Sequence, residues 1–363
     1  MKSHIQNKSW AVCIVMVAAV MPAVHSQAQD TTLPLRFTFS EIHMGAPWKI
    51  VLYAPNETIA NRAAQSAYAR IEELNHILSD YESNSELSQL GATSPSPEPV
   101  HVSDDLFRIL ESAQALSEKS HGAFDITVGP LSKLWRRARR MKEMPPPDML
   151  AAAREATDYK ALQLDPATHT AKLLKPNMRL DAGGIGMGYA VDEAFKVLKN
   201  EGITSALIDA SGDIGMSDPP PGQCGWRVAI EPPSGEGTPS RYVLLSNYAI
   251  TTSGDAFQAV EIDGQRYSHI IDPRTGLGIT GHSSVTVIAP DCITADSYTK
   301  PICVLGPEAG FKIIEAVPGA AAFVEREVPG AAGSEKKEAL QTSRFNQFLA
   351  IMPPIPDTFP APP

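Results

Sequence analysis

One glycine-rich segment of the chain reads Leu180-Asp181-Ala182-Gly183-Gly184-Ile185-Gly186-Met187-Gly188-Tyr189-Ala190. It joins a strand expected at 179–182 to a helix expected at 189–200. Glycines let the backbone approach a phosphate closely, and the N-terminus of a helix favours negative charge. The spacing does not match GxGxxG, and no acidic residue stands where a ribose contact would need one, so a dinucleotide-binding Rossmann fold is disfavoured. The alternative is that these glycines serve only close strand–helix packing.

The pattern outward from this segment favours an α+β fold. Apolar residues at helical spacing predict a long helix at 57–79, and Ser103 is a plausible cap for a second helix at 104–119. Short segments with hairpin turns such as Asp263-Gly264 predict a largely antiparallel sheet with packed helices. We expect strands at 48–54, 204–209, 226–230, 242–245, 259–262, 267–271 and 284–288, and further helices at 295–305 and 307–317.

The N-terminus has the order of a secretory signal peptide. Lys2 and Lys8 precede an uncharged apolar run at 10–24, and small residues follow at 26 and 28. We therefore expect a signal peptide at 1–28, one domain at 29–330, and a flexible insertion with a proline-rich tail at 331–363. A retained membrane anchor is the alternative, although the apolar run is short for a full span.

The composition narrows the possible classes of protein. The chain has 363 residues, of which 43% are hydrophobic and 20% charged, as in ordinary globular proteins. Its formal net charge of −10 argues against nucleic acid as the main partner. Cys224, Cys292 and Cys303 are too few for a disulfide-built scaffold, and a bond between the last two is left open. The basic run at 136–142 is interpreted as a solvated helix face or loop, with phosphate contact as the lesser alternative.

Two segments carry polar residues beside apolar ones. Asp125 and Thr127 interrupt a strand-like apolar run at 122–131, which indicates either a buried hydrogen-bonding network or a ligand contact. The second segment, Tyr267-Ser268-His269-Ile270-Ile271-Asp272-Pro273-Arg274-Thr275-Gly276, ends an apolar strand in a tight turn of the kind that faces ligands. Its histidine is a candidate base or proton shuttle near neutral pH.

Asp296 stands in the first turn of the helix expected at 295–305. A carboxylate there can be only a cap, which is worth about 1 kcal/mol. It can also hold a hard cation that bridges to substrate phosphates, because Mg²⁺ prefers one or two carboxylates together with phosphate oxygens. Its position alone does not decide between these roles.

Seven blocks in order make the chain resemble the FAD:protein FMN transferases of the ApbE family, over nearly all of its mature length. The blocks are Met44-Gly45 with Trp48; Tyr81 with Asn84-Ser85-Glu86-Leu87; 122–131 with Leu134-Trp135; 180–190; Thr252-Ser253-Gly254; 268–276; and Val285-Thr286-Val287-Ile288-Ala289-Pro290 running on to Ala295-Asp296. Because so many blocks occur at family-like spacing, chance agreement is very improbable.

The resemblance implies a T-fold-like α+β enzyme that is exported, either to the periplasm or to the outer face of the cytoplasmic membrane. Such enzymes bind FAD with Mg²⁺, cut its pyrophosphate and pass FMN to a threonine hydroxyl of a partner protein, so that AMP leaves. The implied acceptor is an exported protein such as a subunit of a membrane redox complex, and membrane contact comes only through that partner. The sequence names neither the acceptor nor an oligomeric state.

The resemblance also assigns roles to single residues. His269 is the expected proton acceptor, and Asp296 is expected to be both catalytic and a metal ligand. Mg²⁺ is expected on Asp296, on the carbonyl of Gly184 and on Thr299. The residues expected to bind the flavin dinucleotide are Met44, Tyr81, Ala123, Phe124, Asp125, Asp181, Met187, Ile271, Arg274, Thr275 and Lys300.

Two positions depart from the family pattern. The family usually has lysine where this chain has Met187, and a metal-ligating threonine where it has Lys300. Thr299 lies about 100° around the helix from that position, so it cannot replace the threonine without a local shift. We hypothesise that Lys300 points into the site and supplies the positive charge that Met187 cannot, with Mg²⁺ held more weakly. The alternative is that Lys300 turns to solvent in a degraded site.

These departures keep two other functions open. One is an FAD pyrophosphatase that releases FMN and AMP without a protein acceptor. The other is a non-catalytic exported protein of the same fold that binds FAD.

Overall fold

The computed structural model describes residues 33–230, 239, 241–254, 259–329 and 335–350. The chain divides into a unit that ends at Leu33 and a unit that begins at Pro34, and the fold described below belongs to the second. The signal peptide expected at 1–28 lies outside the described residues. Among the helices within them, none combines the length and the apolar character needed to cross a membrane.

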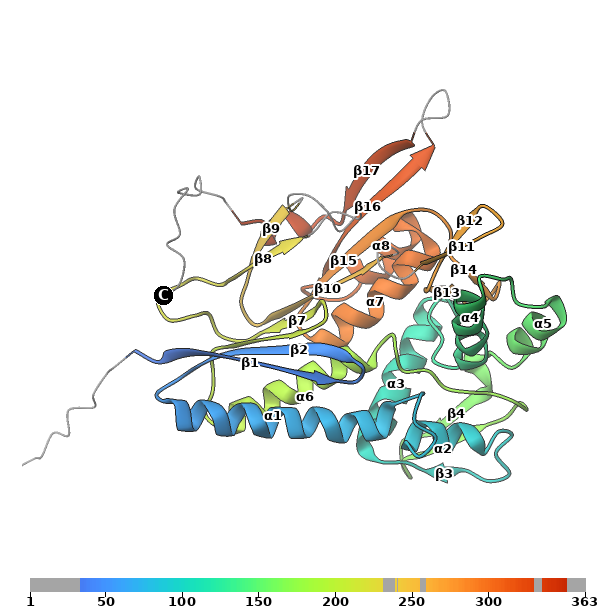
Figure 1. The fold of residues 1–363 in the computed structure, drawn as a ribbon, viewed down its shortest axis with the longest axis horizontal. Coiled ribbons are helices and arrows are strands. Elements are labelled where there is room, and N and C mark those ends of the chain that lie inside the picture. Colours follow the sequence, from blue (N-terminus) through green and yellow to red (C-terminus); the bar gives the residue numbers. More distant parts are fainter. Residues whose placement is uncertain (1–32, 231–238, 240, 255–258, 330–334, 351–363) are drawn as a thin grey trace, which may run out of the picture. The chain divides into compact units, whose positions relative to one another are not determined.

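An antiparallel sheet of eight strands is the centre of the fold (Figure 1). Every neighbouring pair in it is antiparallel, which confirms the expected α+β class and the largely antiparallel sheet. In spatial order the strands are β1 (Leu35–His43), β2 (Ala46–Ala54), β6 (Ala206–Ala210), β7 (Asp213–Met216), β10 (Tyr248–Gly254), β15 (Ser283–Ala289), β16 (Ala321–Pro329) and β17 (Glu335–Gln341).

Helices pack on one face of this sheet through a large apolar core. Figure 1 shows α1 (Glu57–Leu78) beside α6 (Gly186–Asn200), and α6 in turn contacts α7 (Cys292–Leu305), which is followed by α8 (Pro307–Glu315). Small residues spaced along α1, such as Ala60, Ala64 and Ala67, are buried, which allows close packing. The side chain of Asn56 accepts the N–H of Ile59 and fixes where α1 begins.

The opposite face of the sheet is covered by a smaller layer. The hairpin of β8 (Trp226–Ile230) and β9 (Arg241–Leu245), with the short helix Phe345–Phe348, forms a second apolar cluster. Phe345 is fully buried there, and its ring stacks on Phe323 with 5.2 Å between the ring centroids. Residues 335–350 therefore belong to the folded unit.

Smaller elements surround one end of the helical layer. They are α2 (Glu86–Ala92), α3 (Asp104–Lys119), α4 (Gly129–Met141), α5 (Pro147–Glu155), the short helix Tyr159–Ala161, the sheet of β3 (Val100–His101), β5 (Thr170–Leu173) and β4 (Leu162–Asp165), and the pairs β11 (Ala259–Ile262) with β12 (Gln265–Ser268) and β13 (Ile271–Asp272) with β14 (Leu277–Gly278). These elements carry several of the expected site residues.

Three sequence expectations about local structure are wrong. The run at 122–131 is a turn followed by α4, because the Asp125 carboxylate accepts the N–H of Thr127 at 2.8 Å and bends the chain. The segment 179–182 forms only a single bridge, between Arg179 and Val128. The strand expected at 267–271 is interrupted, because β12 ends at Ser268 and β13 begins at Ile271.

The C-terminal region also differs from expectation. The described part of the expected insertion, from residue 335, is strand β17, which pairs with β16 along seven residue positions. The remaining parts of the expected insertion and tail, 331–334 and 351–363, lie outside the described residues. Cys224, Cys292 and Cys303 form no disulfide with one another, which closes the question left open by their spacing.

Candidate active site

The glycine-rich segment and Asp296 meet in the structure. The N–H of Gly188, in the first turn of α6, donates to Asp296 Oδ2 at 3.1 Å. A Cβ on Gly188 would lie 2.4 Å from the carbonyl oxygen of Cys292 and 2.8 Å from the Cβ of Asp296. Only glycine permits this approach of α6 and α7, so close packing explains Gly188. The site carboxylate lies at the helix–helix contact, only 1% exposed.

Lys300 points inward, onto Asp296. Its Nζ donates to the Asp296 carbonyl at 3.0 Å and also contacts Asp296 Oδ1. A Cβ on Gly184 would lie 3.4 Å from Lys300 Cε and 3.4 Å from Phe124 Cε2, so the lysine stem lies against the glycine turn. Burial works against the charged ammonium, but Asp296 and Asp213 outweigh it and raise the pKa of Lys300. The alternative in which Lys300 turns to solvent is wrong.

Thr299 is fully buried and faces β10. Its Oγ1 donates to the Asp296 carbonyl at 2.6 Å and lies 2.8 Å from Ser253 Oγ. The Thr299 hydroxyl, which we expected to bind a metal, is therefore engaged within the protein.

Asp213 is a functional candidate that the sequence analysis passed over. It begins β7 after the tight turn at 211–212 and is half-buried. Burial, then the negative charge of Asp296, raises its pKa well above the usual range, while the Lys300 ammonium opposes this shift. The available signal was a carboxylate directly after a hairpin turn, at the start of a strand that the analysis did not predict. The Asp296–Lys300 pair therefore has a second carboxyl group as a neighbour.

The donor set at Asp296 does not fit a free metal ion as it stands. Both carboxylate oxygens are in use, one by Gly188 and the other by Lys300. The Asp296 carbonyl accepts from Thr299 and from Lys300. Within the described ranges, no group of three or more His, Cys, Asp or Glu residues is arranged to hold a metal. An ammonium holds the position where these donors converge.

Arg136 connects two of the expected flavin contacts. Its guanidinium pairs with Asp80 Oδ2 at 2.6 Å and with Asp181 Oδ2 at 3.2 Å, and it lies 4.1 Å from the ring centroid of Tyr81. Asp181 Oδ1 in turn accepts the N–H of Gly183 at 2.8 Å. Tyr81 is 77% exposed, and its contact with a flavin stays a prediction.

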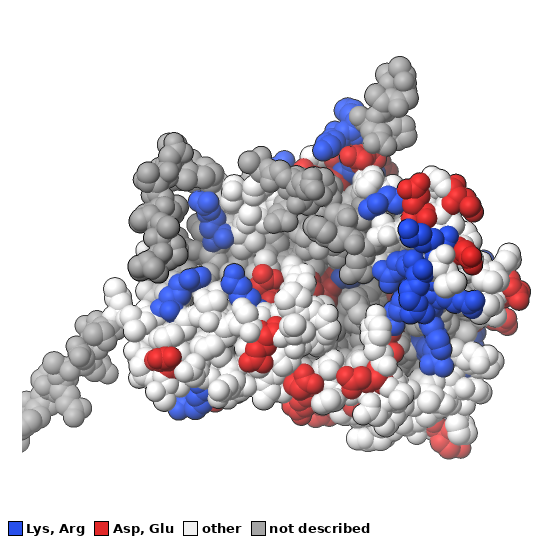
Figure 2. All heavy atoms as spheres, in the orientation of Figure 1, with Lys and Arg blue, Asp and Glu red and all other residues white. Residues whose placement is uncertain are grey.

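The basic run at 136–142 is therefore only partly a solvated helix face. Figure 2 shows Lys and Arg gathered over α4, and Arg137 and Arg140 are exposed there. Arg136 instead turns inward to two carboxylates. The expectation is wrong for Arg136, because periodicity does not show which cation faces buried acids.

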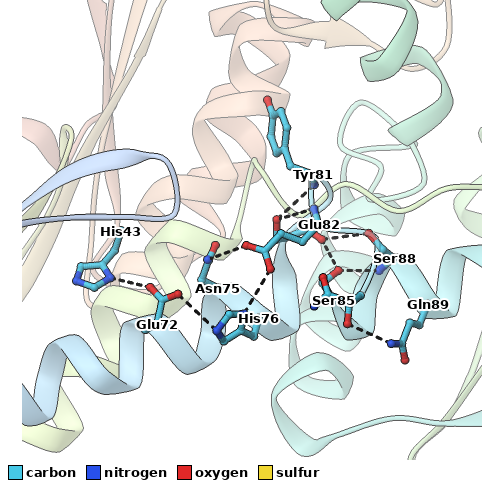
Figure 3. Close-up of polar contacts among 11 residues, drawn as sticks. His43, Glu72, Asn75, His76, Tyr81, Glu82, Ser85, Ser88 and Gln89 are labelled. Atoms are coloured by element: carbon cyan, nitrogen blue, oxygen red, sulfur yellow. Dashed lines mark hydrogen bonds and ion pairs between the residues drawn. The ribbon is translucent and has the colours of Figure 1, made fainter.

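A hydrogen-bonded turn holds Tyr81 in place. Ser79 Oγ accepts the N–H groups of Tyr81 and Glu82 at 3.3 and 3.2 Å (Figure 3). The Glu82 carboxylate accepts from Asn75 Nδ2 at 3.2 Å and lies 3.4 Å from His76 Nδ1, which ties the turn to α1. The Tyr81 ring points away from this network in Figure 3. The turn thus holds the exposed ring in place, with Arg136 over one of its faces.

Asp125 lies in a buried network next to Phe124. Its oxygens accept from the N–H and Oγ1 of Thr127, at 2.8 and 2.7 Å, and from the N–H of Tyr159 at 2.9 Å. Burial raises its pKa to about 6 despite these bonds. Of the two sequence readings, the buried network is confirmed. Flavin contact by Ala123, Phe124 and Asp125 stays a prediction.

Met44 and Met187 lie at the edge of the main core. Met44 has a positive φ of 50°, and its Cε lies 4.0 Å from where a Cβ on Gly186 would stand. Met187 is half-buried against the same core and brings no charge. The two methionines thus flank the glycine turn with apolar surface.

The histidine-bearing turn is built separately. His269 is half-buried in the break between β12 and β13, and Ile271 is half-buried against Trp135. Arg274 Nε pairs with Asp272 Oδ1 at 2.9 Å, and Trp135 Nε1 donates to the carbonyl of Gly276 at 2.8 Å. Arg274 and Thr275 are exposed. Residues 274–276 contact Trp135 of α4 and Arg154 of α5. The roles of His269, Ile271, Arg274 and Thr275 stay predictions.

Comparisons with known proteins show the family to which the chain is similar. The model of the ApbE family matches residues 44–324. The chain is 32% identical over 283 residues to an FAD:protein FMN transferase of Klebsiella pneumoniae, covering 75% of this chain and 79% of that protein. It is 35% identical to one of Vibrio cholerae, covering 68% and 74%.

Solved structures give the same picture. The flavin transferase ApbE from Vibrio cholerae superposes with a TM-score of 0.76 at 30% identity, covering 87% of this chain and all of that one. The apo flavinyl transferase ApbE of Pseudomonas stutzeri gives a TM-score of 0.75 at 28% identity, covering 88% and 98%.

Proposed function

Because the chain belongs to the ApbE family, we propose that it is an FAD:protein FMN transferase whose acceptor is a threonine hydroxyl of an exported protein. Transferase activity with FAD is the activity named for the curated relatives. The threonine, the release of AMP and the exported acceptor are the parts that the proposal adds.

One observation carries the proposal. The first turn of α6 and Asp296 of α7 are joined by the bond from the Gly188 N–H to the Asp296 carboxylate, so the two segments form one site. Around it lie the inward ammonium of Lys300, the aromatic ring of Phe124 and the exposed ring of Tyr81 above Arg136. Cationic groups and a helix N-terminus suit a diphosphate, and exposed aromatic rings suit a flavin or an adenine.

The proposed reaction is a phosphoryl transfer. The threonine oxygen of the acceptor forms a bond to the phosphorus of the FMN half of FAD, and the bond from that phosphorus to the bridging oxygen breaks. The electron pair leaves with AMP, and the hydroxyl proton passes to His269. Positioning and electrostatic stabilisation supply most of the acceleration in such transfers, with a base assisting the hydroxyl.

This chain's own residues have distinct tasks in that reaction. Lys300 and the N-terminus of α6 offset the negative charge of the diphosphate. Arg136 holds Asp181 by an ion pair and the Tyr81 ring by a cation–π contact. The resemblance implies Mg²⁺, which would neutralise phosphate charge, but the donors at Asp296 do not fit the ion as they stand. The proposed transfer does not run through the ion, because the expected metal ligand Asp296 is already engaged by Lys300 and Gly188.

The proposed setting is outside the cytoplasmic membrane. An apolar N-terminal run with two preceding lysines supports export, either to the periplasm or to the outer face of that membrane. A membrane is then met only through the acceptor protein.

Co-expression with an exported acceptor that carries a flavinylation threonine tests the function. Flavin fluorescence of the denatured acceptor band reports covalent transfer, and chromatography of the reaction mixture reports AMP. The proposal predicts a fluorescent acceptor and AMP, both lost when the acceptor threonine is replaced by alanine.

The two other functions give different results. AMP release without acceptor fluorescence would identify an FAD pyrophosphatase. FAD binding with neither product would identify a non-catalytic FAD-binding protein, and either result would contradict transfer.

A further inference from the structure

The carboxylate that the resemblance assigns to a divalent cation, that of Asp296, is held by a lysine of the protein itself. Lys300 Nζ donates to the Asp296 carbonyl and contacts its Oδ1, and the lysine stem lies against Gly184. The Lys300 side chain is only 20% exposed, and that of Asp296 only 1%. The contact therefore forms a shielded pair, unlike a surface ion pair that exchanges freely with water.

We infer that the ammonium of Lys300 takes the place of the divalent cation in this site, so that FAD is bound through its diphosphate without a metal. The inference rests on the proposed function only in naming FAD as the ligand. It separates this chain from any relative in which a metal holds the same carboxylate.

The geometry gives the ammonium a free donor for this task. An ammonium carries three N–H donors, and within the described residues the hydrogen bonds of Lys300 use two of them, both on Asp296. The third can donate to a phosphate oxygen beside Gly184. Asp296 thus orients the ammonium through its carbonyl and its carboxylate, as it would otherwise hold an ion.

A metal could enter this site only by displacing the lysine. The other Asp296 carboxylate oxygen is held by the Gly188 N–H at 3.1 Å, and the Thr299 hydroxyl is held by the Asp296 carbonyl and by Ser253. A divalent ion beside an undisplaced ammonium would meet like charge at close range. Removal of the ammonium should therefore open the site to a metal.

The first test uses Mn²⁺ alone, without FAD, because Mn²⁺ takes oxygen ligands as Mg²⁺ does and is followed by electron paramagnetic resonance. Three proteins are compared: the wild type, Lys300→Thr, and Lys312→Thr as a matched change at an exposed position on α8. We expect Lys300→Thr to bind Mn²⁺ at least about tenfold more tightly than the other two proteins. The double variant Lys300→Thr, Asp296→Asn should lose this gain in Mn²⁺ affinity. Equal Mn²⁺ affinity in the wild type and Lys300→Thr would overturn the inference.

The second test measures FAD affinity by calorimetry, with EDTA or with Mg²⁺. The wild type should bind FAD equally, within about twofold, in both conditions, whereas Lys300→Thr should lose about tenfold in EDTA and regain it with Mg²⁺. Wild-type binding that collapses in EDTA and returns with Mg²⁺ would also overturn the inference. This wild-type measurement stands even if the variant does not fold.

The two tests separate this inference from the proposed function. A wild type that binds no FAD in either condition contradicts the function and the FAD clause of the inference together. The Mn²⁺ comparison then decides on its own whether Lys300 occupies the cation position.

Discussion

Gly188 shows at the scale of one residue why the site depends on glycine. The carbonyl of Cys292 and the Cβ of Asp296 occupy the space that a side chain would need. The same glycine supplies the N–H that holds the Asp296 carboxylate. One position thus sets both the distance between α6 and α7 and the orientation of the carboxylate.

Gly188→Ala should therefore damage stability and binding together. The added methyl group forces α6 and α7 apart, at a cost of about 1–3 kcal/mol in the free energy of unfolding, and FAD affinity should fall because Asp296 and Lys300 shift. Urea unfolding and FAD titration measure the two effects. Gly91→Ala is the control, because a Cβ there has no neighbour nearer than 3.9 Å, and it should be neutral or slightly stabilising in α2. Equal behaviour of the two variants would refute the packing argument.

Arg136→Met tests the second charged contact of the site. Its loss leaves Asp80 and Asp181 facing each other without a cation, so unfolding free energy should drop by about 1–3 kcal/mol and FAD should bind more weakly. Arg137→Met, one residue further and exposed, is the matched control and should change stability by less than about 0.5 kcal/mol. If Arg136→Met left both stability and FAD affinity at the Arg137→Met level, the bridging role would be excluded.

At the scale of elements, α6 holds the start of α7. The Asp192 carboxylate accepts the N–H of Cys292 at 2.8 Å and that of Ile293 at 2.9 Å, while Asp291 accepts the N–H of Thr294 at 2.9 Å. Two acidic residues thus satisfy donors that a helix N-terminus leaves unpaired. The position of Asp296, one turn later, depends on both caps.

Asp192→Asn should change the pH dependence of stability. Burial raises the pKa of Asp192 from 3.8 to about 7 in the folded protein. The protonated Asp192 carboxyl group therefore stabilises the folded protein fully below the pKa that Asp192 has in the unfolded chain. This stabilisation is lost as pH rises through the pKa that Asp192 has in the folded protein. Relative to Asp192→Asn, the wild type should lose about 1.4 kcal/mol per pH unit between about pH 4 and pH 7. Urea unfolding across that range measures the free energy of unfolding of both proteins. Parallel curves of this free energy against pH would show that burial does not raise the pKa of Asp192.

At the scale of the whole molecule, the second apolar layer extends the folded unit beyond residue 330. Phe345→Ala should lower the free energy of unfolding by about 3–5 kcal/mol, because Phe345 is fully buried and stacks on Phe323 of the central sheet. Phe345→Leu, which keeps most of the volume, should cost clearly less. Thermal unfolding checks both variants. If Phe345→Ala left the stability unchanged, residues 335–350 would not contribute to the folded unit.

Local signals in the sequence predicted parts of the fold correctly, whereas pairing between distant segments was missed. The expected helix at 104–119 was correct because its signals are local, since Ser103 accepts the N–H of Leu106. The Asp263-Gly264 hairpin was correct for the same reason, because both residues have positive φ. Strand β17 was missed because its polar sequence is typical of an exposed segment and becomes a strand only by pairing with β16.

The site followed the same rule. The motif blocks predicted that the glycine turn and Asp296 come together, and they do. No local pattern predicted that Arg136 turns inward or that the Asp213 carboxyl group lies near Asp296. Both arrangements depend on residues distant in sequence. The exchange at Lys300 was visible as a departure, but only the fold shows that the ammonium lies on Asp296.

Intact mass spectrometry of a co-expressed acceptor detects FMN transfer by this protein without a labelled substrate. We expect the acceptor to gain the mass of FMN less one water at a single threonine. Asp296→Asn should abolish this gain in a protein that still folds. An acceptor of unchanged mass beside a wild-type protein that binds FAD would contradict the claim that this site transfers FMN.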